Sequence, residues 1–209
     1  RTRNDSRSAF QNWLKAKKYK QLEKESIPVN GLQAHYTFSN GSLKNSVAGA
    51  QNTALRSSST DKPVFENRDN GKALVLNGDQ WFDLNQVGVF RKSEPFSINI
   101  NVFIPKDFKE GVLFHKCISE RLYNFRGYHL YLKDNRLTVN MSHAAPSNAI
   151  SRITQKPVLR NQWVQLTMTY DGSSKAKGLK LFENGTEQKL ETTMDQLTKD
   201  ILLNSKEQP

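Results

Sequence analysis

Residues 96–104 read FSININVFI, and they carry the clearest secondary-structure signal in the chain. Apolar side chains occupy every even position, whereas the first three odd positions carry Ser or Asn. Phe103 is the one departure from the alternation. A period of two predicts a strand with one buried face and one solvent-facing face, as in antiparallel sheets.

Other segments repeat this alternation. Residues 137–142 place Leu, Val and Met between Thr, Asn and Ser, and residues 163–170 place Val, Leu, Met and Tyr between Trp, Gln and two Thr. Leucines at 130 and 132, and again at 179 and 181, mark two more strands. Segments with a helical period are missing between these strands, which excludes a βαβ arrangement.

Turn sequences separate the predicted strands. Residues 133–136 (KDNR), 171–174 (DGSS) and 183–186 (ENGT) each follow a strand segment. The Asn184–Gly185 pair favours a type I′ hairpin, because both residues tolerate positive φ angles. We therefore predict an all-β body, an antiparallel sandwich of two sheets that each have one hydrophobic face.

Composition bounds the class of protein. The chain has 209 residues, of which 36% are hydrophobic and 24% charged, and this excludes collagen, low-complexity disorder and a coiled coil. No stretch approaches the ~18 consecutive apolar residues of a membrane span, so we expect no direct membrane insertion.

The single cysteine, Cys117, cannot form an internal disulfide, and the redox compartment cannot be read from it. We interpret the chain as a fragment whose targeting signal lies outside it.

The basic charge is concentrated near the N-terminus. Residues 1–25 carry eight Lys and Arg against three acidic residues, and the other residues carry 23 against 17, within a total net charge of +11. Residues 8–25 have the spacing of a helix, with Ser8 as N-cap and Phe10 and Leu14 on one face. We predict a basic helical linker over residues 1–28, and no nucleic-acid partner, because no recognition motif accompanies the charge.

Catalytic patterns are missing from the sequence. No strand carries the alternating carboxylates that a retaining glycosidase needs on one face. Cys117 and His115 would share a strand face, but a buried structural thiol is the commoner arrangement. The other histidines, His35, His129 and His143, have no zinc spacing. The sequence therefore predicts that the chain is not an enzyme, with a divergent glycosidase as the least favoured alternative.

Two segments are candidates for ligand binding, because sugar sites combine aromatic and planar polar side chains on loops. Residues 123–128 and 142–148 flank one predicted hairpin and emerge at the same end of it. The candidate residues are Tyr123, Arg126, Tyr128, His143 and Asn148. The alternative is that the aromatic rings cap the core and the polar groups are solvated. We interpret Trp81 and Trp163 as core residues.

The order of these motifs resembles a known family. Residues 161–172 (NQWVQLTMTYDG), followed by 178–185 (GLKLFENG), are similar to the signature of laminin G-like domains of the concanavalin A-like lectin/glucanase superfamily. The earlier strands of this family are similar to residues 35–38, 73–78, 81–84 and 95–100 of the chain. The resemblance covers roughly residues 30 to 200. It implies a jelly-roll sandwich over residues 29–203, followed by a polar tail at 204–209.

The resemblance narrows to a bacterial subgroup on residues 146–150, 172–178 and 197–201. There the module lies within large exported proteins, beside domains of unknown function and a cytochrome c-like region. It implies a periplasmic or cell-surface location and adjacent domains as partners. The loop at 40–46 has Asn45 where calcium-binding relatives place an Asp, so we expect no cofactor and keep calcium near Asn45 as the alternative. Asn101 stands where many members have a Trp.

Two functions follow from this resemblance and from the missing catalytic patterns. The first is a non-catalytic module that binds a glycan or a protein within a larger exported protein. The second is a structural spacer that packs against its neighbours through the N-terminal helix and one sheet face. An exposed apolar patch on Phe10, Trp13 and Leu14 of this helix would favour the spacer.

Overall fold

The computed structural model describes residues 11–12, 30–48, 56–57, 62–68, 71–76, 82–83, 87–117 and 126–202. Its strands are β1 (Arg56–Ser57), β2 (Phe65–Arg68), β3 (Gly71–Leu74), β4 (Phe82–Asp83), β5 (Phe96–Phe103), β6 (Gly111–Cys117), β7 (Gly127–Lys133), β8 (Arg136–Ala144), β9 (Asn148–Thr154), β10 (Trp163–Tyr170), β11 (Leu179–Glu183), β12 (Thr186–Glu187) and β13 (Leu190–Asp195), with a short 3-10 helix, η2 (Ala176–Gly178), before β11.

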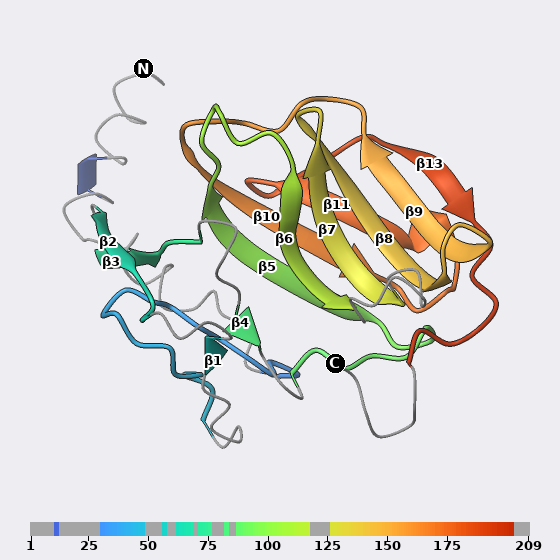
Figure 1. The fold of residues 1–209 in the computed structure, drawn as a ribbon, viewed down its shortest axis with the longest axis horizontal. Helices are drawn as coiled ribbons and strands as arrows, with labels where there is room; N and C mark the ends of the chain where they lie inside the picture. Colours follow the sequence, from blue (N-terminus) through green and yellow to red (C-terminus); the bar gives the residue numbers. More distant parts are fainter. Residues whose placement is uncertain are drawn as a thin grey trace.

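The strands of the main body form two layers. One sheet has the order β12-β11-β10-β5 and the other has the order β13-β9-β8-β7-β6, and all neighbours are antiparallel. Figure 1 shows the two sheets facing each other, with the short pairs β1–β4 and β2–β3 beside them. The predicted all-β antiparallel sandwich is thus confirmed.

The alternation in β5 determines which face of the four-stranded sheet is buried. Phe96 and the next residue after the strand, Ile104, are buried, and the odd-numbered side chains between them are exposed. β5 pairs with β10 along its whole length, from Phe96 opposite Tyr170 to Phe103 opposite Trp163. Residues opposite each other in a sheet share a face, so the even positions of both strands point into the sandwich.

The two tight hairpins have the predicted geometry. Asp134 and Asn135 have φ angles of 50° and 62°, and Asn184 and Gly185 have φ angles of 49° and 77°. Two consecutive positive φ angles define a type I′ turn, whose twist matches that of the flanking strands. These turns fix the register of β7 with β8 and of β11 with β12.

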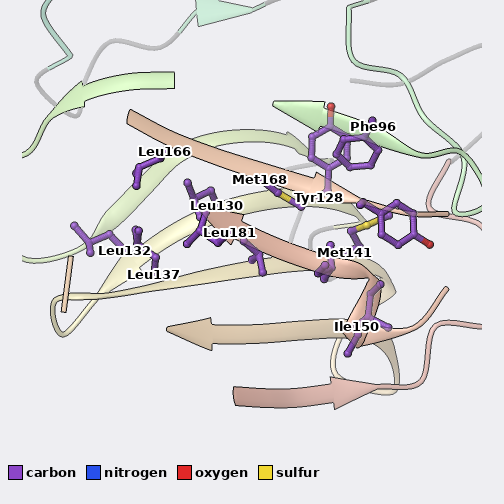
Figure 2. Packing of buried hydrophobic residues seen from close by; sticks show 14 of the residues in the cluster. Phe96, Tyr128, Leu130, Leu132, Leu137, Met141, Ile150, Leu166, Met168 and Leu181 are labelled. Carbon is purple, nitrogen blue, oxygen red and sulfur yellow. The ribbon is translucent and has the colours of Figure 1, made fainter. Parts of the chain in front are cut away.

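The core lies between the two sheets (Figure 2). Leu130, Val139 and Met141 from the five-stranded sheet meet Leu166 and Met168 from the four-stranded sheet, and all five are fully buried. Each such side chain stabilises the fold by about 1.5–3 kcal/mol relative to an exposed position. The core is therefore built from the positions that the alternation marks.

One core assignment is wrong. Trp163 is 46% exposed and does not belong to the core cluster. Trp163 is exposed because side chains alternate between the two faces of a strand. It lies on the same face of β10 as Gln165, opposite to the face of the buried Val164. Trp81 lies outside the described residues.

Several predictions concern segments that the structure does not describe. The predicted N-terminal helix lies outside the described residues except for Gln11 and Asn12, and so does the polar tail at 204–209. The linker boundary at residue 28 therefore stays a prediction. Within the described residues, no helix is long and apolar enough to cross a membrane.

Candidate functional site

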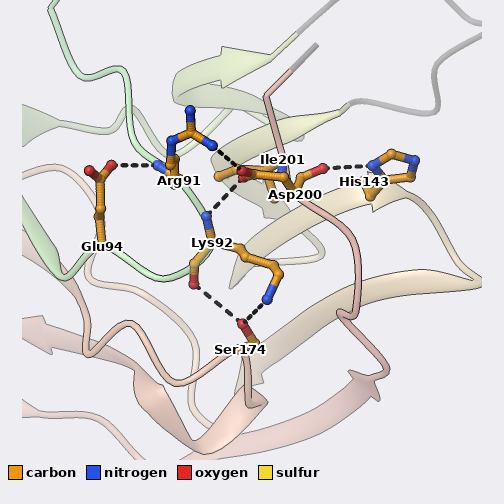
Figure 3. Close-up of polar contacts among 7 residues, drawn as sticks. All are labelled: Arg91, Lys92, Glu94, His143, Ser174, Asp200 and Ile201. Carbon is orange, nitrogen blue, oxygen red and sulfur yellow. Dashed lines mark hydrogen bonds and ion pairs between the residues drawn. The ribbon is translucent and has the colours of Figure 1, made fainter. Parts of the chain in front are cut away.

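Two of the predicted ligand-binding residues, Arg126 and His143, lie side by side at one end of the sandwich. The Arg126 Nε donates to the His143 carbonyl oxygen at 3.0 Å, and an Arg126 Nη lies 3.1 Å from His143 Nε2. His143 Nδ1 lies 2.6 Å from the Asp200 carbonyl oxygen (Figure 3). The structure brings these two candidate residues together, but they face the C-terminal segment of their own chain.

Asp200 is held from several directions. Its carboxylate accepts a hydrogen bond from the Lys92 backbone N–H at 3.1 Å and from the Ile201 N–H at 2.8 Å. It also pairs with Arg91 Nη1 at 3.2 Å (Figure 3). These contacts join the loop before β5 to the segment after β13, which are far apart in sequence.

Asn148 has the same kind of role. Its Oδ1 accepts the backbone N–H groups of Thr198 and Lys199, both at 3.1 Å, and its Nδ2 donates to Thr198 Oγ1 at 2.6 Å. We call Arg91, Lys92, Arg126, His143, Asn148 and Asp200 the loop-end network. The polar groups of this network hold residues 198–201 against the sandwich. Because they are used in this way, the network offers few free donors or acceptors to a ligand.

The structure places Tyr128 in the core, whereas a ligand platform requires an exposed ring. The side chain is 2% exposed, and its ring lies 4.8 Å from that of Phe96. The hydroxyl donates to the Gly88 carbonyl oxygen at 2.6 Å, and burial raises the pKa of this phenol. Tyr123 lies outside the described residues.

Cys117 is a buried thiol, as the commoner interpretation predicts. Its Sγ donates to the Tyr128 carbonyl oxygen at 3.1 Å and lies 3.8 Å from His129 Nδ1. Burial raises the pKa of Cys117 to about 12, so the thiol keeps its proton at neutral pH and is a poor nucleophile. Burial, together with the nearby His115, lowers the pKa of His129 to about 4.

The position suggested for calcium is occupied by hydrogen bonds. The Asn45 Oδ1 accepts the backbone N–H groups of His35 at 2.9 Å and Val47 at 3.1 Å, and Nδ2 donates to the Gln33 carbonyl oxygen at 3.1 Å. A cation at Asn45 would have to displace two amide donors. Among the described residues, no group of three His, Cys, Asp or Glu side chains could hold a metal ion.

A different surface carries exposed polar groups, on the outer face of the four-stranded sheet. Gln165 lies opposite Asn101, and Thr167 lies opposite Asn99. The Asn99 Nδ2 donates to Thr167 Oγ1 at 2.6 Å, whereas neither Asn101 nor Gln165 has a side-chain hydrogen-bond partner among the described residues. We call Asn99, Asn101, Gln165 and Thr167 the outer strip.

Aromatic rings lie at the end of this strip. Phe103 and Trp163 face each other across β5 and β10, are 36% and 46% exposed, and have ring centroids 6.0 Å apart in an edge-to-face arrangement. Arg68 lies over the Phe103 ring, with its guanidinium carbon 5.4 Å from the ring centroid. Phe182 of β11 lies opposite Thr167 on the same face and is half-buried. We call Phe103 and Trp163 the aromatic pair.

Sequence reasoning missed this surface, although its signal was present. Phe103 broke the polar series of β5, and Trp163 stood at a position of the same parity as Gln165. Both are large apolar residues on the solvent-facing side of predicted strands, where a packed core gives no reason for them. The register that brings them together is visible only in the structure.

Further apolar side chains are exposed at the same end of the sandwich. Phe108, Val112 and Leu159 are exposed, and we call them the apolar end. Arg160 connects their loops, because its Nη1 donates to the carbonyl oxygens of Pro105 at 3.1 Å and Phe108 at 3.0 Å. The loop-end network lies at the other end of the β5–β10 pair.

No family model matches the chain, and no curated protein matches it. Among solved structures, the chain is similar to the binding domain of botulinum neurotoxin serotype G, with 19% identity and a TM-score of 0.48. This similarity covers 73% of the chain and 37% of the neurotoxin chain. The assignment of an all-β sandwich therefore rests on the sheets and their register.

Proposed function

We propose that the chain is a non-catalytic binding module of a larger exported bacterial protein. The resemblance of residues 161–172 and 178–185 to laminin G-like domains supports this class, and so does the sandwich fold. The same resemblance supports a periplasmic or cell-surface location and a chain whose partners include adjacent domains.

The observation that carries the proposal is the exposed aromatic pair. Trp163 and Phe103 are exposed on the outer face of β10 and β5, two strands that pair with each other along the whole length of β5. Large aromatic side chains are enriched at recognition surfaces, where their burial against a ligand supplies most of the binding free energy. A rigid sheet also loses little conformational entropy when a ligand binds to it.

Chemistry on this surface favours binding over catalysis. The outer strip contains amides and hydroxyls, which donate and accept hydrogen bonds but do not transfer protons at neutral pH. The thiol in the described residues is buried and protonated. We therefore propose recognition of a carbohydrate or protein ligand and no reaction.

Binding measurements on the purified chain test this proposal. The wild-type chain and Trp163→Ala are screened against immobilised polysaccharides and against the neighbouring domains of the parent protein. We expect at least one ligand whose binding is lost in Trp163→Ala and kept in Asn148→Ala. Equal binding by both variants to every ligand would contradict a site on the aromatic pair.

The structural spacer is a second candidate, and the apolar end favours it. Phe108, Val112 and Leu159 are exposed together, as expected for a face that packs against a neighbouring domain. In a chain extended by its neighbours, Leu159→Ser should then lower the unfolding temperature, whereas in the isolated chain it should not. Equal effects in both chains would contradict the spacer.

A further inference from the structure

We propose that the ligand of this surface is a neutral, extended glycan that lies along β10 over the outer strip, with one sugar ring on Trp163. This inference rests on the proposed binding function and specifies its ligand. Four features of the outer face lead to it: an exposed ring, free amides, the length of the strip and its lack of unpaired charge.

The exposed ring supplies a stacking surface. Trp163 is 46% exposed, and the edge-to-face contact with Phe103 holds the indole in place from the neighbouring strand. A pyranose ring has an apolar face of C–H groups, which can pack on an aromatic ring. Burying that ring against a sugar removes apolar surface from water without ordering a flexible loop.

The amides supply hydrogen bonds that the protein does not itself use. Asn101 and Gln165 lie opposite each other, next to the aromatic pair, and neither side chain has a partner among the described residues. Each side-chain amide can both donate and accept hydrogen bonds, and so can each sugar hydroxyl. The two groups therefore match without a change of charge or protonation.

The length of the strip fits a chain rather than a single sugar. Thr167 lies four residues along β10 from Trp163, which corresponds to about 13 Å in a strand. The Thr167 hydroxyl is positioned by the 2.6 Å hydrogen bond from Asn99, and Phe182 lies beside it on β11. Stacking and polar positions thus extend along the strand far enough for several sugar rings in a row.

The charges on this face favour a neutral ligand. The outer strip carries no ionisable group, and Lys180 on the same face is paired with Glu187 at 3.3 Å. The Arg68 guanidinium over the Phe103 ring is likewise paired, with Glu66. An acidic glycan would find no unpaired cation on the strip. The net charge of +11 attracts polyanions over the whole surface, but such binding is screened by salt.

Isothermal titration of the chain with cellohexaose, xylohexaose and mannohexaose, at low and at high NaCl, tests the inference. We expect one of these neutral oligosaccharides to bind with an affinity that is insensitive to salt. Trp163→Ala should weaken binding at least about tenfold, as for a central aromatic contact, and Asn101→Ala/Gln165→Ala should weaken it about fivefold. Gln196→Ala, an exposed amide after β13, is the matched control and should bind as the wild type does.

The outcomes separate this inference from the proposed function. If none of the neutral oligosaccharides binds, but the screen of immobilised polysaccharides and neighbouring domains finds an acidic glycan or a domain whose binding is lost in Trp163→Ala, the neutral glycan is overturned and the binding surface stays in place. If a neutral oligosaccharide binds and neither variant weakens its binding, the glycan site does not lie on the outer strip. If no ligand of either kind binds in a Trp163-dependent way, both proposals are wrong. Thermal unfolding of each variant shows that it is folded, which excludes loss of structure as the cause.

Discussion

The two ends of the β5–β10 pair use polar side chains in opposite ways. At the Phe96 and Tyr170 end, the side chains of the loop-end network bond to the protein itself, with Asp200 and Asn148 each held by several partners. Toward the Phe103 and Trp163 end, the amides of Asn101 and Gln165 face solvent, and neither side chain has a hydrogen-bond partner among the described residues.

The two ends differ in how many of their hydrogen-bonding groups a ligand could use. The loop-end residues have the chemistry of a sugar site, but their donors and acceptors are already matched by the C-terminal segment. A ligand there would have to break existing hydrogen bonds, and the exchange gains little free energy. A ligand on the outer strip replaces only water. The two surfaces therefore differ in whether their hydrogen-bonding groups are available to a ligand, and not in the types of residue that they contain.

The largest expected effect is on stability, at Tyr128. Tyr128→Ala removes a buried ring and its hydrogen bond to Gly88, and we expect a loss of about 3–5 kcal/mol in the free energy of unfolding. Tyr128→Phe keeps the ring and should cost about 1 kcal/mol. Urea denaturation measures both values. A stable Tyr128→Ala that had lost ligand binding would instead return this residue to the binding site.

The next effect depends on pH. His129 has a folded pKa of about 4 against an ordinary 6.5, because burial disfavours the protonated imidazole. The unfolded chain therefore binds a proton first as the pH falls, and stability should drop between pH 6.5 and 4 by at most about 3 kcal/mol. Above pH 6.5 this contribution is complete and constant.

Thermal unfolding from neutral to acidic pH measures this dependence. His129→Gln, which does not titrate, should show a flatter profile than the wild type over the same range. Parallel profiles for the two proteins would show that His129 is not the responsible group.

A smaller effect is expected at the loop-end network. Asn148→Ala removes three hydrogen bonds to residues 198 and 199 and should lower stability by about 1–2 kcal/mol. Amide hydrogen exchange should show faster exchange at Thr198 and Lys199, while the core strands stay protected. Unchanged exchange at these two amides would contradict their role in fastening the segment.

The sequence specified most of the sandwich, and the reason is local. Alternation in residues 96–104 and 163–170 marks the buried face of each strand, and Asn184–Gly185 specifies its turn without help from distant residues. The candidate site could not be predicted in the same way. That Gln165 faces Asn101, or that Asp200 approaches Arg91, depends on pairings between distant segments, and no local pattern encodes them.

The core assignment of Trp163 failed for a related reason. Tryptophan is largely apolar and is usually buried, so residue type suggested the core. Its position in β10 pointed to the outer face, and position decided the outcome. The hairpin predicted that the segments of Arg126 and His143 emerge at one end, but no local pattern predicted that the C-terminal segment contacts both residues.

The measurement that tests the central contrast most directly compares Trp163→Ala with Asn148→Ala, each assayed for unfolding temperature and for oligosaccharide affinity. We predict that Trp163→Ala loses affinity and keeps its unfolding temperature within a few degrees, because its side chain is exposed on a paired strand. Asn148→Ala should show the reverse, with lower stability and unchanged affinity. Loss of affinity in Asn148→Ala at an unchanged unfolding temperature, with full affinity in Trp163→Ala, would contradict the account and place the ligand at the loop end.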